Sequence, residues 1–265
     1  MRIAALQLDI AWCAPALNVE KIERRLAELM KQAATGGDEP IALFVLPEMF
    51  TTGFVMTPQG VADGQQQTLT WMKRMAADYQ VALAGSVAVE QEGAFFNRFY
   101  FVQPDGTVDH YDKRHLFTYG GEQKAYQSGE NRVIVSYRGY RFLLQICYDL
   151  RFPLFSRNTA KDPYDVILYV ANWPTSRIAV WNTLLVARAL ENQCYVVGVN
   201  RVGEDTAALY NGSSAIINAY GKSLTVAPTE QEELLTATLD SAALQRFRAK
   251  FPVLEDADSF VLKEE

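Results

Sequence analysis

The chain has 265 residues, of which 49% are hydrophobic and 12% aromatic, a composition that fills a sizeable core and argues against disorder. Its net charge of -6 disfavours nucleic acid or an anionic membrane as the main partner. The first ten residues are too short a stretch, and reach Asp9 too soon, for a signal peptide, and no apolar run is long enough to span a membrane. Three cysteines without close pairing suit a reducing compartment, so we expect a cytoplasmic protein.

Strands and helices alternate over the first third of the chain. The pattern predicts, in order, a strand at 2–8, a helix within 16–37, a strand at 41–46, a helix at 67–79 and a strand at 81–90. Asn18 is a candidate N-cap of the first helix, and the glycine pair at 36–37 a candidate stop. Pro47 ends the 41–46 strand, which leaves Glu48 at its C-terminal edge.

The middle of the chain favours antiparallel hairpins. Residues 95–113 contain a Pro-Asp-Gly turn between two strand patterns, and residues 132–147 turn at Arg138–Gly139. Alternation then returns, with a helix near 153–161, a strand at 165–172, a helix at 177–191, a strand at 194–200, strands near 213–218 and 233–239, and a short helix with a tail over 241–256. Without a linker or low-complexity tract, this order predicts one α/β domain with mixed sheets over 1–265.

Four of the predicted strands end in a polar cluster. They read "FVLPE", "LLQICYD", "LYVANWP" and "VVGVNR". Ligand sites gather at the carboxyl ends of strands in α/β sheets, so these four ends are candidates to face one cavity. The alternative is that polar residues simply mark where each strand gives way to a loop.

Cys147 is the first candidate for chemistry. It ends an apolar strand, and Asp149 and Arg151 follow at once, whereas Cys194 begins an apolar strand and Cys13 lies in a loop. The alternative is a buried core thiol, because free cysteine is among the most buried residue types. We interpret Cys194 as such a core thiol.

A nucleophilic thiol needs an activating group, because its reference pKa is about 8.5 and the thiolate is the reactive form. Either of the two histidines, His110 or His115, is a candidate base. The alternative base is a carboxylate at a strand end, and Glu48 is such a residue. Lys113, after the predicted hairpin, is a candidate cation for the thiolate or an oxyanion, and Glu122 lies in a glycine-containing loop.

Motifs for other chemistries are absent from the sequence. There is no phosphate-binding glycine loop, dinucleotide fingerprint, paired-cysteine motif or zinc-protease motif, so we expect no metal and no cofactor. The Gly-x-Ser-x-Gly elbow of serine hydrolases is also missing.

Taken in order, "RIAALQLD", "LPEMF", "YDKRHLF", "ICYDLRFP", "RALENQCYVVGVNR" and "GSSAIINAYGK" resemble the nitrilase superfamily of carbon–nitrogen hydrolases over almost the whole chain. The family's catalytic Glu–Lys–Cys set falls on Glu48, Lys113 and Cys147, and its second glutamate on Glu122. The resemblance implies that the histidines are not bases. It also implies a four-layer α-β-β-α sandwich that pairs into a homodimer.

Within the superfamily, "ANWPTSR" is most similar to the bacterial omega-amidase branch. That branch implies hydrolysis of the distal amide of small 2-oxo dicarboxylic acid monoamides, such as 2-oxoglutaramate and 2-oxosuccinamate. The rivals are another amidase of the family, such as one acting on deaminated glutathione, a nitrilase proper, and a non-catalytic binding or assembly module. The helical stretch 179–193 either packs on a sheet or forms a dimer face, and periodicity does not separate the two.

The expected mechanism is acyl transfer through a thioester on the cysteine, with Glu48 as base and with Lys113 and the backbone N–H of Tyr148 holding the oxyanion. Glycines in the loop 117–128 permit closure over the site. The candidate substrate-binding residues are two cations for the substrate carboxylate and two aromatic walls: Arg177, Arg151, Trp173 and Phe117. The alternatives are a structural ion pair for Arg151 and a core position for the two aromatic residues.

Overall fold

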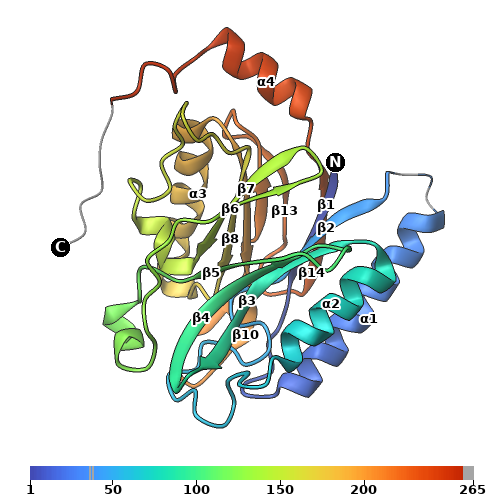
Figure 1. The fold of residues 1–265 in the computed structure, drawn as a ribbon, viewed down its shortest axis with the longest axis vertical. Coiled ribbons are helices and arrows are strands. Elements are labelled where there is room, and N and C mark those ends of the chain that lie inside the picture. The colour runs from blue at the N-terminus through green and yellow to red at the C-terminus, as the bar shows by residue number, and fades with distance from the viewer. Residues whose placement is uncertain (36, 38, 259–265) are drawn as a thin grey trace.

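The computed structural model, which describes residues 1–35, 37 and 39–258, contains two six-stranded mixed sheets (Figure 1). In the first sheet the strand order is β14 (Glu233–Thr238), β1 (Arg2–Gln7), β2 (Ile41–Val45), β3 (Ala82–Gln91), β4 (Ala94–Val102) and β5 (Val108–Asp112). In the second it is β13 (Ser223–Val226), β12 (Ala215–Ile217), β9 (Tyr195–Asn200), β8 (Val166–Ala171), β7 (Tyr140–Ile146) and β6 (Ile134–Tyr137). Three neighbouring strands at the centre of each sheet are parallel, and the outer pairings are antiparallel.

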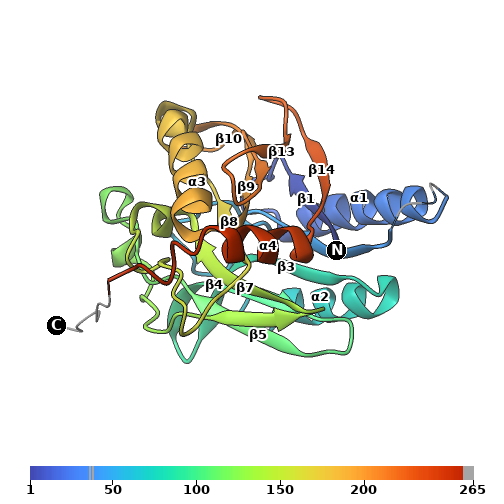
Figure 2. The ribbon, with the colours of Figure 1, turned by 90° about the horizontal axis from the view of Figure 1, so that it is seen from above.

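The helices cover the outer faces of the two sheets (Figures 1 and 2). The helices α1 (Pro15–Thr35) and α2 (Gln67–Tyr79) lie against the first sheet, and α3 (Ile178–Asn192) lies against the second. The last helix, α4 (Ser241–Lys250), lies at one end of the sandwich, near the N-terminus of β1. A small separate sheet joins β10 (Val202–Glu204) to β11 (Leu209–Asn211). The predicted four-layer arrangement with mixed sheets is therefore confirmed.

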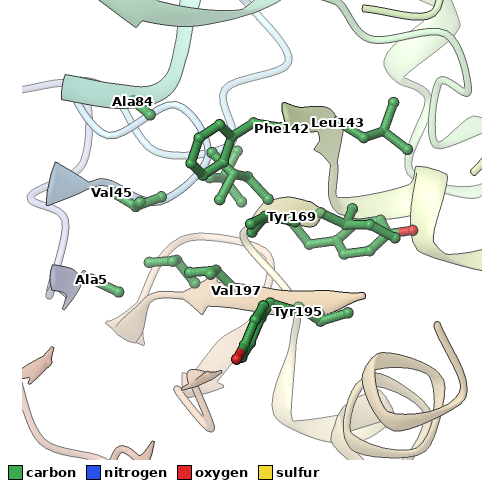
Figure 3. Close-up of a cluster of buried hydrophobic side chains, with 14 of the residues drawn as sticks. Ala5, Val45, Ala84, Phe142, Leu143, Tyr169, Tyr195 and Val197 are labelled. Carbon is green, nitrogen blue, oxygen red and sulfur yellow. The ribbon is translucent and has the colours of Figure 1, made fainter. Parts of the chain in front are cut away.

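Alternation along the strands divides the apolar side chains between two cores. On β1, Ile3 and Ala5 face the second sheet, whereas Ala4 and Leu6 join the core beneath α1 and α2. Figure 3 shows part of the larger buried cluster, in which Ala5, Val45 and Ala84 of the first sheet face Phe142 and Val197 of the second, whereas Leu143 and Tyr169 point away from the first sheet. This shared core fixes the two sheets relative to each other, and with them the strand ends that carry the site.

Most of the predicted elements are confirmed, and the helix at 67–79 is confirmed with its exact boundaries. Two predictions are wrong. The helix predicted near 153–161 is a series of turns. Asn158 accounts for part of this, because its side chain binds the backbone of Tyr164 and Asn192 and competes with helical hydrogen bonds. Asn18 is not an N-cap, because α1 already begins at Pro15 and the Asn18 amide binds Ala11 and Thr51 instead.

The predicted stop of α1 falls partly on Gly36, which lies outside the described residues. Gly37 has a φ of +70°, a conformation that glycine adopts without strain, and α1 ends at Thr35. The strands β10, β11 and β13 were not predicted, because each has only three or four residues.

The α3 helix packs on its sheet through one face. Trp181 and Leu185 approach Gly198 of β9 so closely that a Cβ atom there would meet the Leu185 side chain at 2.5 Å. Val180 and Leu184, beside them on the helix, are half-buried and pack against the same core. One part of the predicted apolar face therefore packs on the sheet. The homodimer and the single domain over 1–265 stay predictions.

Two features are absent from the part of the chain that the structure describes. None of the helices in this part is long and apolar enough to cross a membrane. The same part of the chain contains no group of three His, Cys, Asp or Glu side chains that could hold a metal ion.

Candidate active site

Glu48 lies just past the end of β2, and its carboxylate is fully buried between the two sheets. Oε1 accepts hydrogen bonds from Lys113 Nζ at 2.9 Å and from Asn97 Nδ2 at 2.8 Å. Oε2 accepts one from the backbone N–H of Asn172 at 2.7 Å, and the Asn172 amide donates to the Glu48 carbonyl at 2.7 Å. Asn172 follows β8, so the Glu48 side chain is held by strands of both sheets.

Lys113 follows β5, and its ammonium group is fully buried between two carboxylates. Besides Glu48, it contacts Glu122 at 3.0 Å to Oε1 and 2.8 Å to Oε2. Glu122 Oε2 also accepts the backbone N–H of Phe117 at 2.6 Å, and the Phe54 ring lies 5.2 Å from Lys113 Nζ. The ammonium thus donates to three carboxylate oxygens, one of Glu48 and two of Glu122.

Burial and charge oppose each other at Lys113. Burial lowers the pKa of its ammonium, but the Glu122 and Glu48 carboxylates outweigh burial, so the pKa is raised and the group stays charged. Burial also raises the pKa of Glu122, with Lys113 acting against it and Glu48 reinforcing it. The cluster therefore holds one permanent cation between two buried carboxyl groups.

Cys147 begins a short 3₁₀ helix, Cys147–Arg151, directly after β7. Its φ of +44° lies in the left-handed region, which costs energy for a residue with a Cβ atom and is common at functional sites. The buried Asp149 holds this turn by accepting hydrogen bonds from the N–H of Ile146 and the hydroxyl of Tyr111, both at 2.8 Å, while His115 Nδ1 lies 2.7 Å from its other oxygen. Asp149 therefore fixes the backbone turn that positions the Cys147 side chain.

Cys147 is 9% exposed, and the Glu48 carboxylate is the charge that acts most strongly on its thiol. Burial raises its pKa well above the ordinary value, the negative charge of Glu48 adds to this, and Lys113 opposes it. The thiol is therefore protonated near neutral pH and sits beside a group that can take the proton. This arrangement suits a nucleophile that loses its proton as it attacks.

A cavity of about 360 Å³ opens over Cys147. Its walls combine apolar, mostly aromatic side chains with two arginines. The lining includes Phe54, Met56, Phe117, Tyr119, Tyr148, Arg151, Trp173, Arg177, Ala207, Ala208 and Tyr210. The Arg151 guanidinium lies over Trp173 and that of Arg177 over Phe117, each 5.2 Å from the ring centre. Within the residues that the structure describes, neither guanidinium makes an ion pair or a hydrogen bond.

The structure brings most of the residues singled out from the sequence to this one place. Glu48, Lys113, Glu122 and Cys147 form the cluster. The other five candidates line the cavity: Tyr148, Arg151, Phe117, Trp173 and Arg177. The structural ion pair considered for Arg151 does not occur among the described residues.

Some of the alternatives are not at the site. His110 is an exposed residue of β5, and His115 is tied to Asp149 and stacked on Phe152 with ring centres 3.8 Å apart. Of the four strand ends expected at one cavity, the last contributes no arginine, because the Arg201 guanidinium turns away to bind the carbonyls of Ile10 and Val202. Cys194 is a fully buried core thiol, as predicted.

Two buried amides at the site were missed from the sequence. Asn97 lies in the middle of β4, and Asn172 ends β8. A signal existed for both, because asparagine is disfavoured in strands and each one interrupts or ends an apolar run. Without a folded partner in view, neither could be assigned to Glu48.

Comparison with known proteins points to a family. The carbon–nitrogen hydrolase family matches residues 2–249. The chain is similar to omega-amidase YafV of Escherichia coli (strain K12), with 44% identity over 99% of this chain and 98% of the relative. It is also similar to 2-oxoglutaramate amidase of Bacillus subtilis (strain 168), with 31% identity over 96% of each chain.

Solved structures agree. The crystal structure of XC1258 from Xanthomonas campestris, described as a CN-hydrolase superfamily protein with an arsenic adduct in the active site, has a TM-score of 0.93 and 41% identity over 99% of each chain. Saccharomyces cerevisiae Nit3, a nitrilase-superfamily member, shares the fold, with a TM-score of 0.81 and 22% identity over 95% of this chain and 94% of its own. The chain is therefore a hydrolase that belongs to the carbon–nitrogen hydrolase family of the nitrilase superfamily, on its bacterial omega-amidase branch.

Proposed function

We propose that the protein hydrolyses the distal amide of 2-oxo dicarboxylic acid monoamides, such as 2-oxoglutaramate and 2-oxosuccinamate, through a thioester on Cys147. The observation that carries this proposal is the buried cluster of Glu48, Lys113 and Glu122 beside a thiol at the floor of a cavity with two unpaired arginines. The names of the relatives from Escherichia coli and Bacillus subtilis support the choice of substrate class.

In the first step, Glu48 takes the thiol proton while Cys147 Sγ forms a bond to the amide carbon. The electron pair of the carbonyl π bond moves to the oxygen, which becomes an oxyanion. The Lys113 ammonium and the backbone N–H of Tyr148 stabilise that charge. Tyr148 suits this role because N–H groups in the first turn of a helix have no acceptor within the helix.

In the second step, the protonated Glu48 gives its proton to the amide nitrogen, the C–N bond breaks, and ammonia leaves a thioester on Cys147. Glu48 then takes a proton from water, whose oxygen attacks the thioester carbon. The C–S bond breaks, the 2-oxo acid leaves, and the sulfur recovers the proton held by Glu48. The cycle consumes one water and restores every group.

Glu122 acts on Lys113 in this scheme. Its two oxygens contact the ammonium at 2.8 and 3.0 Å, and its own direction is set by the Phe117 N–H. This fixes where the ammonium meets the oxyanion, whereas Glu48 is the carboxylate whose charge acts more strongly on the pKa of the thiol. Glu122 is thus the orienting carboxylate and Glu48 the base.

Substrate recognition falls to the cavity walls. The substrate carries a carboxylate at the end remote from its amide, and the protein has a net charge of -6, so a local cation is needed. Arg177 is the first candidate and Arg151 the second, because a planar guanidinium binds a carboxylate with two hydrogen bonds. Trp173 and Phe117 form the apolar surfaces behind them.

The test is ammonia release from five compounds: 2-oxoglutaramate, 2-oxosuccinamate, glutamine, deaminated glutathione and a simple nitrile. Turnover of the two 2-oxo amides, lost in Cys147→Ala, is the expected result. Preference for deaminated glutathione or for the nitrile would replace the substrate class while keeping the mechanism. Activity that survives Cys147→Ala would overturn the mechanism itself.

A further inference from the structure

Asn97 contacts three residues of the cluster at once. Its side-chain NH₂ group donates to Glu48 Oε1 at 2.8 Å and to Glu122 Oε1 at 3.2 Å, and its backbone carbonyl accepts the N–H of Lys113 at 3.0 Å. The residue is fully buried on β4, where asparagine is disfavoured. A buried amide in that position is retained only if its hydrogen bonds are made.

The direction of the Asn97 amide is fixed by a chain of hydrogen bonds that begins beside Glu48. The backbone N–H of Met49, which can only donate, binds Ser86 Oγ at 2.9 Å. The Ser86 hydroxyl then donates to Asn97 Oδ1 at 2.9 Å, which leaves the NH₂ group to face the two carboxylates. Ser86 lies opposite Phe99 on the neighbouring strand, so it is the diagonal neighbour of Asn97.

We propose that Asn97, oriented by Ser86, is a positioning residue that keeps Glu48 aligned as the base for Cys147 and separate from Glu122. This rests on the proposed role of Glu48. The two NH₂ hydrogens reach one oxygen of each carboxylate, so the amide spans the pair and prevents them from sharing a proton directly. With both amide hydrogens engaged, Glu48 Oε1 keeps its direction through the cycle while the proton moves to and from the carboxylate.

Losing the amide donors removes that alignment. Asn97→Leu keeps the volume but donates nothing, so kcat is expected to fall roughly 10- to 100-fold, the worth of one or two hydrogen bonds to a charged group, with KM within threefold. The rate at which iodoacetamide alkylates Cys147 is expected to fall as well. Alkylation needs no substrate, so it reports on the thiol even if the substrate class is wrong.

Asn97→Asp separates positioning from packing. The new carboxyl group keeps the shape, but it can donate only when it is protonated. It faces Glu48, Glu122 and Lys113, with Cys147 and Tyr126 as the other titratable groups nearby. The ratio of kcat in Asn97→Asp to kcat in Asn97→Leu is therefore expected to rise as the pH falls.

Ser86→Ala tests whether the serine acts through Asn97. Alone it is expected to lower kcat several-fold, because the amide is free to turn its carbonyl toward the carboxylates. Added to Asn97→Leu it is expected to change nothing further, as a double-mutant cycle requires for residues that act as one unit. Ser156→Ala is the matched control, because it removes another fully buried hydroxyl, which donates to the Pro153 carbonyl and not to Asn97.

The outcomes divide cleanly. A pH-dependent ratio, slowed alkylation and a non-additive cycle support the proposal. A flat ratio with alkylation rates equal to wild type in folded variants, or additive effects of Ser86→Ala and Asn97→Leu, would overturn it. If alkylation changes as expected but none of the 2-oxo amides is hydrolysed, the positioning role stands and the proposed substrate fails.

Discussion

Two regions meet at Cys147, and they are built in opposite ways. On the side of the first sheet, Glu48, Lys113 and Asn97 are fully buried, and the polar groups that face the cluster are hydrogen-bonded to neighbours in the fold. On the cavity side, Arg151 and Arg177 rest on aromatic rings without a carboxylate partner among the described residues. The fold itself completes the hydrogen bonding of the buried cluster, whereas the two cations on the cavity side remain available to a ligand.

The difference has an energetic meaning. A saturated buried cluster costs no reorganisation when charge develops in the transition state, so changes there act on kcat. An arginine that lacks a partner makes its hydrogen bonds only when substrate arrives, so changes there act on KM. The predictions below use this division.

The largest effect is expected for Cys147→Ala. Removing the sulfur removes the covalent intermediate, so kcat for 2-oxoglutaramate is expected to fall by at least about 10,000-fold, as for nucleophiles elsewhere. Cys13→Ala is the matched control, because this cysteine is half-buried in a loop away from the cluster. Comparable losses in both variants would mean that the loss comes from folding and not from chemistry.

Lys113→Met comes next. It removes an oxyanion donor worth about 3–4 kcal/mol of barrier, and it leaves Glu48 and Glu122 buried without a cation. We expect kcat to fall about 100- to 1,000-fold and the free energy of unfolding in urea to fall by about 3–5 kcal/mol. A variant with wild-type stability would show that the cluster is not the saturated region described above.

Arg177→Ala is expected to act on binding alone. The lost bidentate contact is worth about 1.5–3 kcal/mol, so KM for a 2-oxo acid amide should rise roughly 10- to 150-fold while kcat stays within threefold. The urea midpoint should move little, because what the substitution removes from the fold is the cation–π contact of the guanidinium with Phe117 and Tyr119. Arg151→Ala is the companion variant, and an amide without a carboxylate is the substrate control. An unchanged KM for Arg177→Ala would assign the carboxylate to another residue.

The smallest effect concerns the ultraviolet absorbance of the Cys147 thiolate, which should be missing at neutral pH. Burial raises the pKa of the Cys147 thiol, so the thiol binds its proton until the pH is well above neutral. The difference in ultraviolet thiolate absorbance between wild type and Cys147→Ala should therefore be close to zero at neutral pH and appear only in alkali. A thiolate band at neutral pH would mean that Lys113, and not Glu48, controls the resting state.

Sequence patterns predicted what depends on local chemistry. Glu48 and Cys147 stand out because a charged or reactive group follows an apolar strand, and the turn at Arg138–Gly139 follows from the residues alone. The helix predicted at 153–161 failed because Asn158 binds distant backbone groups that the sequence does not place nearby. Short strands such as β10 carry too few residues for a pattern.

The same limit explains what was missed at the site. Asn97 and Asn172 belong to the site because they bind Glu48, which lies 49 and 124 positions away in the chain. Their partners become neighbours only when the sheets pack, so no window of sequence contains the interaction. Family resemblance pointed to Glu48, Lys113, Cys147 and Glu122, but not to the two amides that bind Glu48.

The hydrogen bond between Asn172 and Glu48 also bears on how activity returns after unfolding. It joins the two sheets across 124 positions, and contacts of such long separation form late because the loop they close is costly. Helices, and strand pairs that are close in the sequence, are expected to regain their backbone structure before this contact exists. On dilution from urea, amidase activity should therefore recover after the far-ultraviolet circular dichroism, and enzyme assays would follow the docking of the sheets in time.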